Sequence, residues 1–240
     1  MKRGVVRAMN LMVCPSLSVL EEKVLHDSEC FDYLLRFLTN PMSEMFRDPS
    51  YVLSLRERVI PILKTYPSLK IWVAGCSTGE EVYSLAILLQ EEELLERTIL
   101  YATDINPRSL EKAETGIFEL GNIQKFTWNY QKSGGKGSLS DYYTAAVNSV
   151  KFNSALKKNV IFANHSLVTD AVFSEMHLIS CRNVLIYFDR ELQDRVFGLF
   201  HESLCRKCFL GLGSKETILF SRHAKYFDTF VQKDRIFQKK

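Results

Sequence analysis

The sequence lacks the features that mark several broad classes of protein. No apolar run approaches the roughly 18 residues that a membrane-spanning helix needs. The opening residues, MKRGVVRAMNLMVC, hold too short an apolar stretch for a secretory signal. A net charge of +3 is also too small to indicate nucleic-acid binding. We therefore predict a cytoplasmic protein that neither inserts into membranes nor binds nucleic acid.

The cysteines lack the spacing of a disulfide framework or a metal site. The chain has 6 of them, mostly inside apolar segments, which is typical of thiols that stay reduced in the cell. Cys205 and Cys208 form a C-x-x-C with His201 one helical turn earlier. A structural zinc site normally takes four ligands, and the sequence offers no second pair. We predict reduced cysteines and no metal.

The hydrophobic content is high enough for a well-packed domain. The 240 residues suit one domain, or one domain with a small appendage, and 46% of them are hydrophobic. Residues 1–66 have the apolar spacing of helices, and one of these is predicted to open near Pro49. The stretch at 39–48 contains Asn, Pro and Ser and is predicted to be a loop. Residues 1–66 are therefore predicted as an N-terminal helical region.

Residues 67–240 alternate between strand-like and helix-like segments. The predicted strands are KIWVAG, TILYATD, NVIFANH, HLISC and CFLGLG, and the predicted helices include PRSLEKAETGIF and RELQDRVFGLFHESL. Such alternation favours a Rossmann-like α/β domain, with a parallel sheet and helices on both faces. The closing YFDTFVQKDRIFQKK has a two-strand rhythm and is predicted to add an antiparallel hairpin at the edge.

Residues 121–158 interrupt this alternation. They contain KSGGKGS, a flexible turn, followed by strand-like pieces in DYYTAAVNSVKF. A long structureless loop is unusual inside a compact domain. We predict that this segment forms a small inserted antiparallel β-subdomain.

The first predicted strand ends in VAGCSTGEE, where a ligand site is expected. Open α/β sheets bind ligands beyond the carboxyl ends of their strands. Asp104 ends the next strand, about 25 residues after Gly79, and an acid at that place accepts the hydroxyls of a ribose. The glycine loop and Asp104 together predict a nucleoside site.

The acids in the loop narrow the choice of nucleoside. The loop does not match G-x-G-x-x-G, and Glu80 and Glu81 would repel a pyrophosphate. The same carboxylates suit an ammonium group. S-adenosylmethionine carries a ribose, a sulfonium and an ammonium group, and it has no phosphate. The alternative is that both acids only complement the positive end of a helix dipole.

Three segments together resemble the CheR family of chemoreceptor glutamate O-methyltransferases. They are IWVAGCSTGEEVYSLAILL, ATDINPRSLEKAETGIF and CRNVLIYFD, and SEMFRDPSYVLSLRE resembles the segment before the family's catalytic domain. The resemblance spans roughly Leu34 to Lys239. It implies a Rossmann-like class I methyltransferase sheet, S-adenosylmethionine as cofactor, and the cytoplasmic helices of a methyl-accepting chemoreceptor as partner.

The resemblance also implies the site residues. Arg47, in the predicted catalytic loop at 39–48, and Tyr187 are the implied catalytic residues. Glu81 stands at the acid for the methionine end of the cofactor, and Asp104 at the ribose acid. The residues implied to contact the cofactor are Ser43, Arg47, Gly75, Glu81, Asp104, Ser166, Leu167, Arg182 and Asn183.

The chain departs from the family's pattern in several places. Pro41 stands where many members have a cofactor-binding Asn, Ser43 where Thr is usual, and Ser166 where the family has Asn. The region before Ser43 is shorter than the family's N-terminal helical domain. The inserted lobe resembles the β-subdomain that grips a receptor's C-terminal peptide in some members.

Three functions compete on the sequence alone. The first is a protein-glutamate O-methyltransferase, the second a non-catalytic module that binds S-adenosylmethionine, and the third a nicotinamide dehydrogenase. The incomplete glycine pattern argues against the dehydrogenase. The presence of both Arg47 and Tyr187 favours catalysis over simple binding.

Overall fold

The computed structural model describes residues 2–27, 29–31, 33–34 and 43–240. The chain divides into two compact units, residues 1–42 and 43–240. Residues 43–66, expected to group with the N-terminal helices, lie within the second unit. Nowhere in the described ranges is a helix long and apolar enough to cross a membrane.

The first unit contains two short helices, α1 (Lys2–Leu11) and α2 (Leu17–His26). The second of these begins after Ser16, whose hydroxyl oxygen accepts a hydrogen bond from the Val19 N–H at 3.3 Å. These two helices agree with the helical character predicted for this part of the chain.

The second unit is built on a seven-stranded sheet in the order β6-β2-β1-β7-β8-β10-β9. The first five of these strands pair in parallel, and the last two form an antiparallel edge hairpin, so the predicted sheet and hairpin are confirmed. The strand order reverses beside β1, which makes its carboxyl end the topological switch point. The strands are β1 (Leu69–Ala74), β2 (Thr98–Asp104), β6 (Val160–Asn164), β7 (Met176–Cys181), β8 (Leu204–Leu212), β9 (Phe227–Val231) and β10 (Ile236–Lys239).

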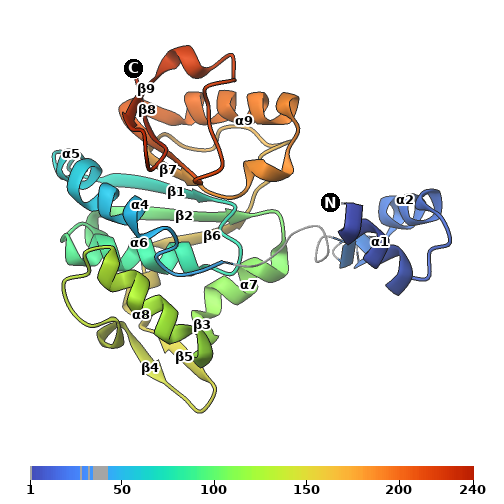
Figure 1. The fold of residues 1–240 in the computed structure, drawn as a ribbon, viewed down its shortest axis with the longest axis horizontal. Helices are drawn as coiled ribbons and strands as arrows, with labels where there is room; N and C mark the ends of the chain where they lie inside the picture. The colour runs from blue at the N-terminus through green and yellow to red at the C-terminus, as the bar shows by residue number, and fades with distance from the viewer. Residues whose placement is uncertain (1, 28, 32, 35–42) are drawn as a thin grey trace. The chain divides into compact units, whose positions relative to one another are not determined.

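The two faces of the sheet are covered by different helices. Successive side chains of a strand point to opposite faces. Ile71 and Val73 therefore pack with α6 (Glu80–Glu91), while Trp72 packs against α9 (Arg190–Ser203). Figure 1 shows α9 on one side of the sheet and α6 and α8 on the other.

The helix predicted to open at Pro49 does so, but it is not regular. It runs from α4 (Pro49–Ser54) through a π-helical turn at Leu55–Val59 into α5 (Ile60–Leu63). Pro61 has no N–H to donate, and its ring would crowd a carbonyl of a regular helix. The wider turn directly before it accommodates the ring.

The inserted subdomain is a three-stranded antiparallel sheet in the order β3-β5-β4, which confirms the predicted lobe. It differs from expectation in that a helix, α8 (Ile123–Lys132), lies between its strands in sequence. The residues GIF, predicted as helix, open the sheet instead, since Gly116 at φ +67° ends α7. The elements are α7 (Pro107–Thr115), β3 (Ile117–Glu119), β4 (Tyr143–Ala145) and β5 (Ser149–Phe152).

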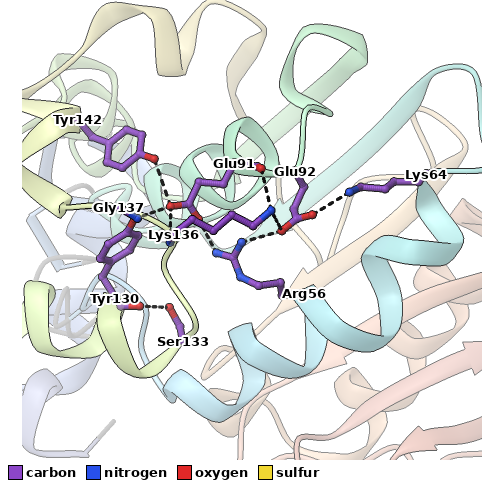
Figure 2. Close-up of polar contacts among 9 residues, drawn as sticks. All are labelled: Arg56, Lys64, Glu91, Glu92, Tyr130, Ser133, Lys136, Gly137 and Tyr142. Carbon is purple, nitrogen blue, oxygen red and sulfur yellow. Dashed lines mark hydrogen bonds and ion pairs between the residues drawn. The ribbon is translucent and has the colours of Figure 1, made fainter.

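Buried charges join the insert to the end of α6 (Figure 2). Arg56 pairs with Glu91 at 2.5 Å and with Glu92 at 2.8 Å. Lys64 and Lys136 also reach Glu92, at 2.8 and 2.9 Å. The side chains of both acids are less than a tenth exposed, and a buried charge without a close partner is strongly destabilising.

Neutral donors complete the network on the side of the insert. The Tyr130 hydroxyl, from α8, donates to Glu91, and the Tyr142 hydroxyl donates to the same oxygen at 3.2 Å. The backbone N–H of Gly137 donates to the Tyr130 hydroxyl at 3.0 Å. The turn KSGGKGS is therefore fastened to α6 rather than left loose.

We expect acid to weaken this network. Burial raises the pKa of Glu92, but hydrogen bonds from Lys64, Lys136 and Arg56 outweigh burial and lower the pKa from 4.5 to about 2. A carboxyl group whose pKa is lowered by folding stabilises the fold above its unfolded pKa, and that contribution is lost as pH falls through the folded value. The free energy of unfolding should therefore fall between about pH 4.5 and pH 2.

Urea unfolding of wild type and Glu92→Gln at several pH values checks this. The variant should lose about 1–3 kcal/mol near neutrality and show a flatter acid limb. Glu96→Gln, at an exposed position just beyond α6, is the matched control and should follow wild type. Equal acid sensitivity of Glu92→Gln and wild type would contradict the prediction.

Candidate active site

The glycine loop after β1 needs both of its glycines. Gly75 has φ +79° and Gly79 φ +96°, in the left-handed region where side chains are strained. Space is also short, because a Cβ on Gly75 would lie 2.4 Å from Val184 Cγ2. The Gly75 and Cys76 N–H groups donate to the Thr103 carbonyl at 2.8 and 2.9 Å, which ties the loop to the end of β2.

Asp104 lies beside this loop, as the sequence predicted. Its Oδ2 accepts from the Ser77 N–H at 2.8 Å and its Oδ1 from the Asn106 N–H at 2.9 Å. Burial raises the pKa of Asp104, and the backbone N–H donors from Asn106 and Ser77 act against that rise. Each oxygen has further lone pairs, so the carboxylate can also accept from two ribose hydroxyls. This donor and acceptor pattern fits the nucleoside of S-adenosylmethionine.

The two loop acids have different partners. Glu80 is buried and accepts from the Thr78 hydroxyl at 2.7 and 2.9 Å. Burial raises the pKa of Glu80, while hydrogen bonds from Thr78 and Ser43 counteract the effect. Ser43, implied as a cofactor contact, is thus already engaged with Glu80. This pairing has no signal in the sequence.

Glu81 meets the end of β7. The Ser180 hydroxyl donates to its Oε1 at 2.5 Å, and Arg182 Nη1 donates to its Oε2 at 3.3 Å. The Tyr51 hydroxyl shares a hydrogen bond with Ser180 at 2.8 Å. The acid is therefore oriented from two sides and carries the negative charge that an ammonium group would seek.

Arg182 joins three parts of the chain. Its side chain is 2% exposed and pairs with Asp48 at 2.7 Å and with Glu81 at 3.3 Å. Its Nη2 also donates to the Arg47 carbonyl at 2.9 Å. The guanidinium carbon lies 4.2 Å from the centre of the Tyr51 ring, a favourable cation–π contact. Arg182 thus brings the loop of Arg47 next to the acid Glu81.

The loop that carries Arg47 is held along its length. The Phe46 N–H donates to Ser84 Oγ at 2.8 Å, and Asn129 Nδ2 donates to the Met45 carbonyl at 3.0 Å. Phe46 is fully buried although its φ is +52°, a conformation that needs firm support. Arg47 itself is half-buried. Residues 39–42 of the predicted loop, with Pro41, lie outside the described residues.

A second buried acid, Glu216, shapes the turn that leads to Tyr187. Its Oε2 accepts from the N–H groups of Gly213 at 2.7 Å and Asn183 at 2.9 Å, and its Oε1 from Ile186 at 3.3 Å. Asn183 has φ +61°, and its Oδ1 is buried without a hydrogen-bond partner among the described residues. Glu216 could not be recognised from the sequence, since a lone acid in a loop gives no signal.

Tyr187 ends a 3₁₀ turn, Leu185–Tyr187, which follows β7 in the chain. It is half-buried, and in the described part of the chain its hydroxyl has no hydrogen-bond partner. The hydroxyl is therefore available to a substrate.

Ser166 and Leu167 follow β6 and have local partners. Ser166 Oγ accepts from the Thr169 N–H at 3.2 Å, and the Ser166 N–H donates to Asp170 at 2.9 Å. Leu167 is buried in the core beneath α9. The structure places both after β6, at the carboxyl end of the sheet.

Comparison with known protein families identifies the family of this chain. The model described as "CheR methyltransferase, SAM binding domain" matches residues 41–235. The chain belongs to the CheR methyltransferase family. Its cofactor is S-adenosylmethionine, and the observed sheet agrees with the class I methyltransferase sheet that the resemblance implied.

Two relatives in sequence agree with this assignment. Cher3 of Pseudomonas putida, provisionally named a methyltransferase, is 55% identical over 99% of this chain and 87% of its own. A chemotaxis protein methyltransferase of Listeria monocytogenes is 30% identical over 80% of this chain and 71% of its own. Among solved structures, the N-methyltransferase NodS of Bradyrhizobium japonicum, bound to S-adenosylhomocysteine, is 13% identical with a TM-score of 0.45, covering 92% of this chain and 97% of its own.

Removing the Asp104 carboxylate should weaken cofactor binding. Asp104→Ala leaves the ribose hydroxyls without an acceptor, at a cost of about 1–3 kcal/mol, so the Kd for S-adenosylhomocysteine should rise at least several-fold. Calorimetry measures this. Asp141→Ala is the control, because that acid also accepts a backbone N–H, from Ser138 at 3.1 Å, but lies in the insert. An unchanged Kd for Asp104→Ala would place the nucleoside elsewhere.

Proposed function

We propose that this protein transfers the methyl group of S-adenosylmethionine to glutamate side chains of a chemoreceptor-type protein in the cytoplasm, giving glutamyl methyl esters. The proposal rests on family membership together with one structural observation. Arg182 pairs with Glu81 and also binds the carbonyl of Arg47, so the implied cofactor acid and the implied catalytic arginine are neighbours. The relatives named chemotaxis protein methyltransferase support the same substrate class.

The proposed roles follow from the charges around Arg182. Its single positive charge pairs with two acids, Glu81 and Asp48. These three side chains together therefore carry one negative charge in excess. An incoming ammonium group would offset that charge at Glu81. We assign Glu81 to the methionine end of the cofactor and Asp104 to its ribose. Gly75, Asn183 and the Ser166–Leu167 pair are assigned to the surrounding contacts.

The reaction needs little acid–base help. Bound S-adenosylmethionine supplies an electrophilic methyl group. A glutamate with a pKa near 4.3 is already ionised at neutral pH, so this chain needs no general base. Arg47 offers a two-pronged donor to the carboxylate, and its fixed backbone limits where that carboxylate can lie. Alignment of this kind contributes up to roughly 7–11 kcal/mol.

Tyr187 completes the proposed site. The Tyr187 hydroxyl orients the second oxygen of the substrate carboxylate. Exclusion of water also matters, because a solvated carboxylate is a weaker nucleophile. A module that only binds S-adenosylmethionine would transfer no methyl group, so methyl transfer by wild type that is lost when Arg47 or Tyr187 is removed would separate the two functions.

Arg47→Ala should abolish most methyl transfer and leave the melting temperature nearly unchanged. The side chain is only half-buried, so its removal costs little core packing, but the substrate carboxylate loses its cation. Initial rates with labelled cofactor and a chemoreceptor fragment measure the effect. Arg206→Ala, at an exposed position on β8, is the matched control. Full activity in Arg47→Ala would show that the catalytic arginine is misassigned.

The product should be an ester and not a methylamine. A lysine acceptor, with a pKa near 10.4, would need a base or a desolvated pocket, and Arg47 would repel its ammonium form. We expect brief alkali treatment of receptor labelled by this protein to release volatile methanol. Label that stays on the receptor would identify nitrogen as the acceptor and refute carboxyl methylation.

A further inference from the structure

An exposed apolar surface lies next to the turn of Tyr187 and has no role in the site described above. It consists of Ile186, Leu219 and Phe220, which are 49%, 59% and 87% exposed. We call these three residues the apolar rim. Ile186 directly precedes Tyr187 in the same 3₁₀ turn, so the rim is continuous with the proposed site.

The loop that displays Phe220 is firmly attached to the domain. Ile218 is 1% exposed and packs in the core beneath α9. Asp194, on α9, accepts from the Ser221 hydroxyl at 2.7 Å and from the Arg222 N–H at 2.8 Å. Exposed apolar side chains that lie together, unlike single scattered ones, mark interaction surfaces.

A cavity opens beside the rim. Its volume is about 160 Å³, and Ile186, Phe197 and Phe220 contribute to its walls. A cavity of about 150 Å³ is large enough to hold a benzene ring. This one can therefore receive a single apolar or aromatic side chain from a partner.

The charges at the mouth of the cavity favour an acidic partner. Arg190 and Lys215 line it, are exposed, and have no ion pair with any described residue. The acids that line it are already engaged. Asp194 pairs with Arg222 at 2.7 Å, and Glu216 accepts from three backbone N–H groups. The unpaired charge that a partner would meet here is positive.

We propose that the apolar rim, with Arg190 and Lys215, is a docking surface for the protein substrate. The partner that fits is an acidic amphipathic helix. One apolar side chain of it enters the cavity, its acidic residues face Arg190 and Lys215, and another glutamate on the same helix reaches Tyr187. The inference rests on the proposed function, because it assigns a second contact to the same substrate.

Binding and kinetics with a chemoreceptor cytoplasmic fragment test the surface. Phe220→Ser and the double variant Arg190→Glu, Lys215→Glu should each weaken fragment binding and raise its KM by about tenfold. Their kcat and their Kd for S-adenosylhomocysteine should match wild type, because neither change touches the cofactor site. Added salt should weaken wild-type binding more than that of the charge variant.

Two controls separate docking from general disturbance. Phe220→Leu keeps an apolar side chain and should retain most of the affinity, and Arg206→Glu reverses a charge at the other end of β8 and should behave as wild type. Unchanged fragment affinity and KM in both test variants would overturn the docking surface. A shift from dimer to monomer in Phe220→Ser, seen by sedimentation, would overturn it too, since the rim would then join two copies.

The two proposals fail in different ways. Wild type that binds the fragment but forms no methyl ester would refute the proposed function. The affinity of the variants for the fragment would still test the docking surface. Wild type that forms the ester with variants of equal KM would refute the surface alone. Wild type that neither binds nor methylates the fragment would refute both.

Discussion

The site depends on one buried cation. The Arg182 guanidinium is almost completely removed from water, and a charge in that position is tolerated only with close partners. Its partners come from the loop after residue 43, the start of α6 and the ring of Tyr51. Loss of Arg182 would leave Asp48 and Glu81 facing each other without compensation. The same cation therefore stabilises the fold locally and sets the spacing of the site.

Much of the fold follows from local patterns. The strands of the main sheet have apolar runs of the right length, and Asp104 ends its strand where the pattern places it. The prediction from sequence was wrong where neighbouring residues gave a stronger signal for another kind of structure. Helix α8 was missed because glycine and strand-forming residues nearby dominated the interpretation, although Ile123, Phe126 and Tyr130 have helical spacing and are all buried.

The chemistry of the site was less accessible to sequence reasoning than the fold. The resemblance named Glu81 and Arg182 separately, but only the folded chain shows that they pair. Ser180, Glu216 and the Ser43–Glu80 contact had no sequence signal, because each depends on residues that are far apart along the chain. Hydrogen-bond partners of this kind are decided by tertiary packing, which periodicity and propensity do not encode.

The Arg182 contact also has a consequence for the order in which the protein is assembled. Arg47 and Arg182 are 135 residues apart in sequence, so the loop cannot be fixed until most of the chain has been synthesised. Closing a loop costs conformational entropy before the contact stabilises the chain, so contacts of such long range slow folding. Strands β1, β2 and β6 precede β7 in the chain, whereas the contact between Arg182 and the loop of Arg47 has to wait for the end of β7. A nascent chain therefore lacks this part of the proposed site until that strand has emerged and paired.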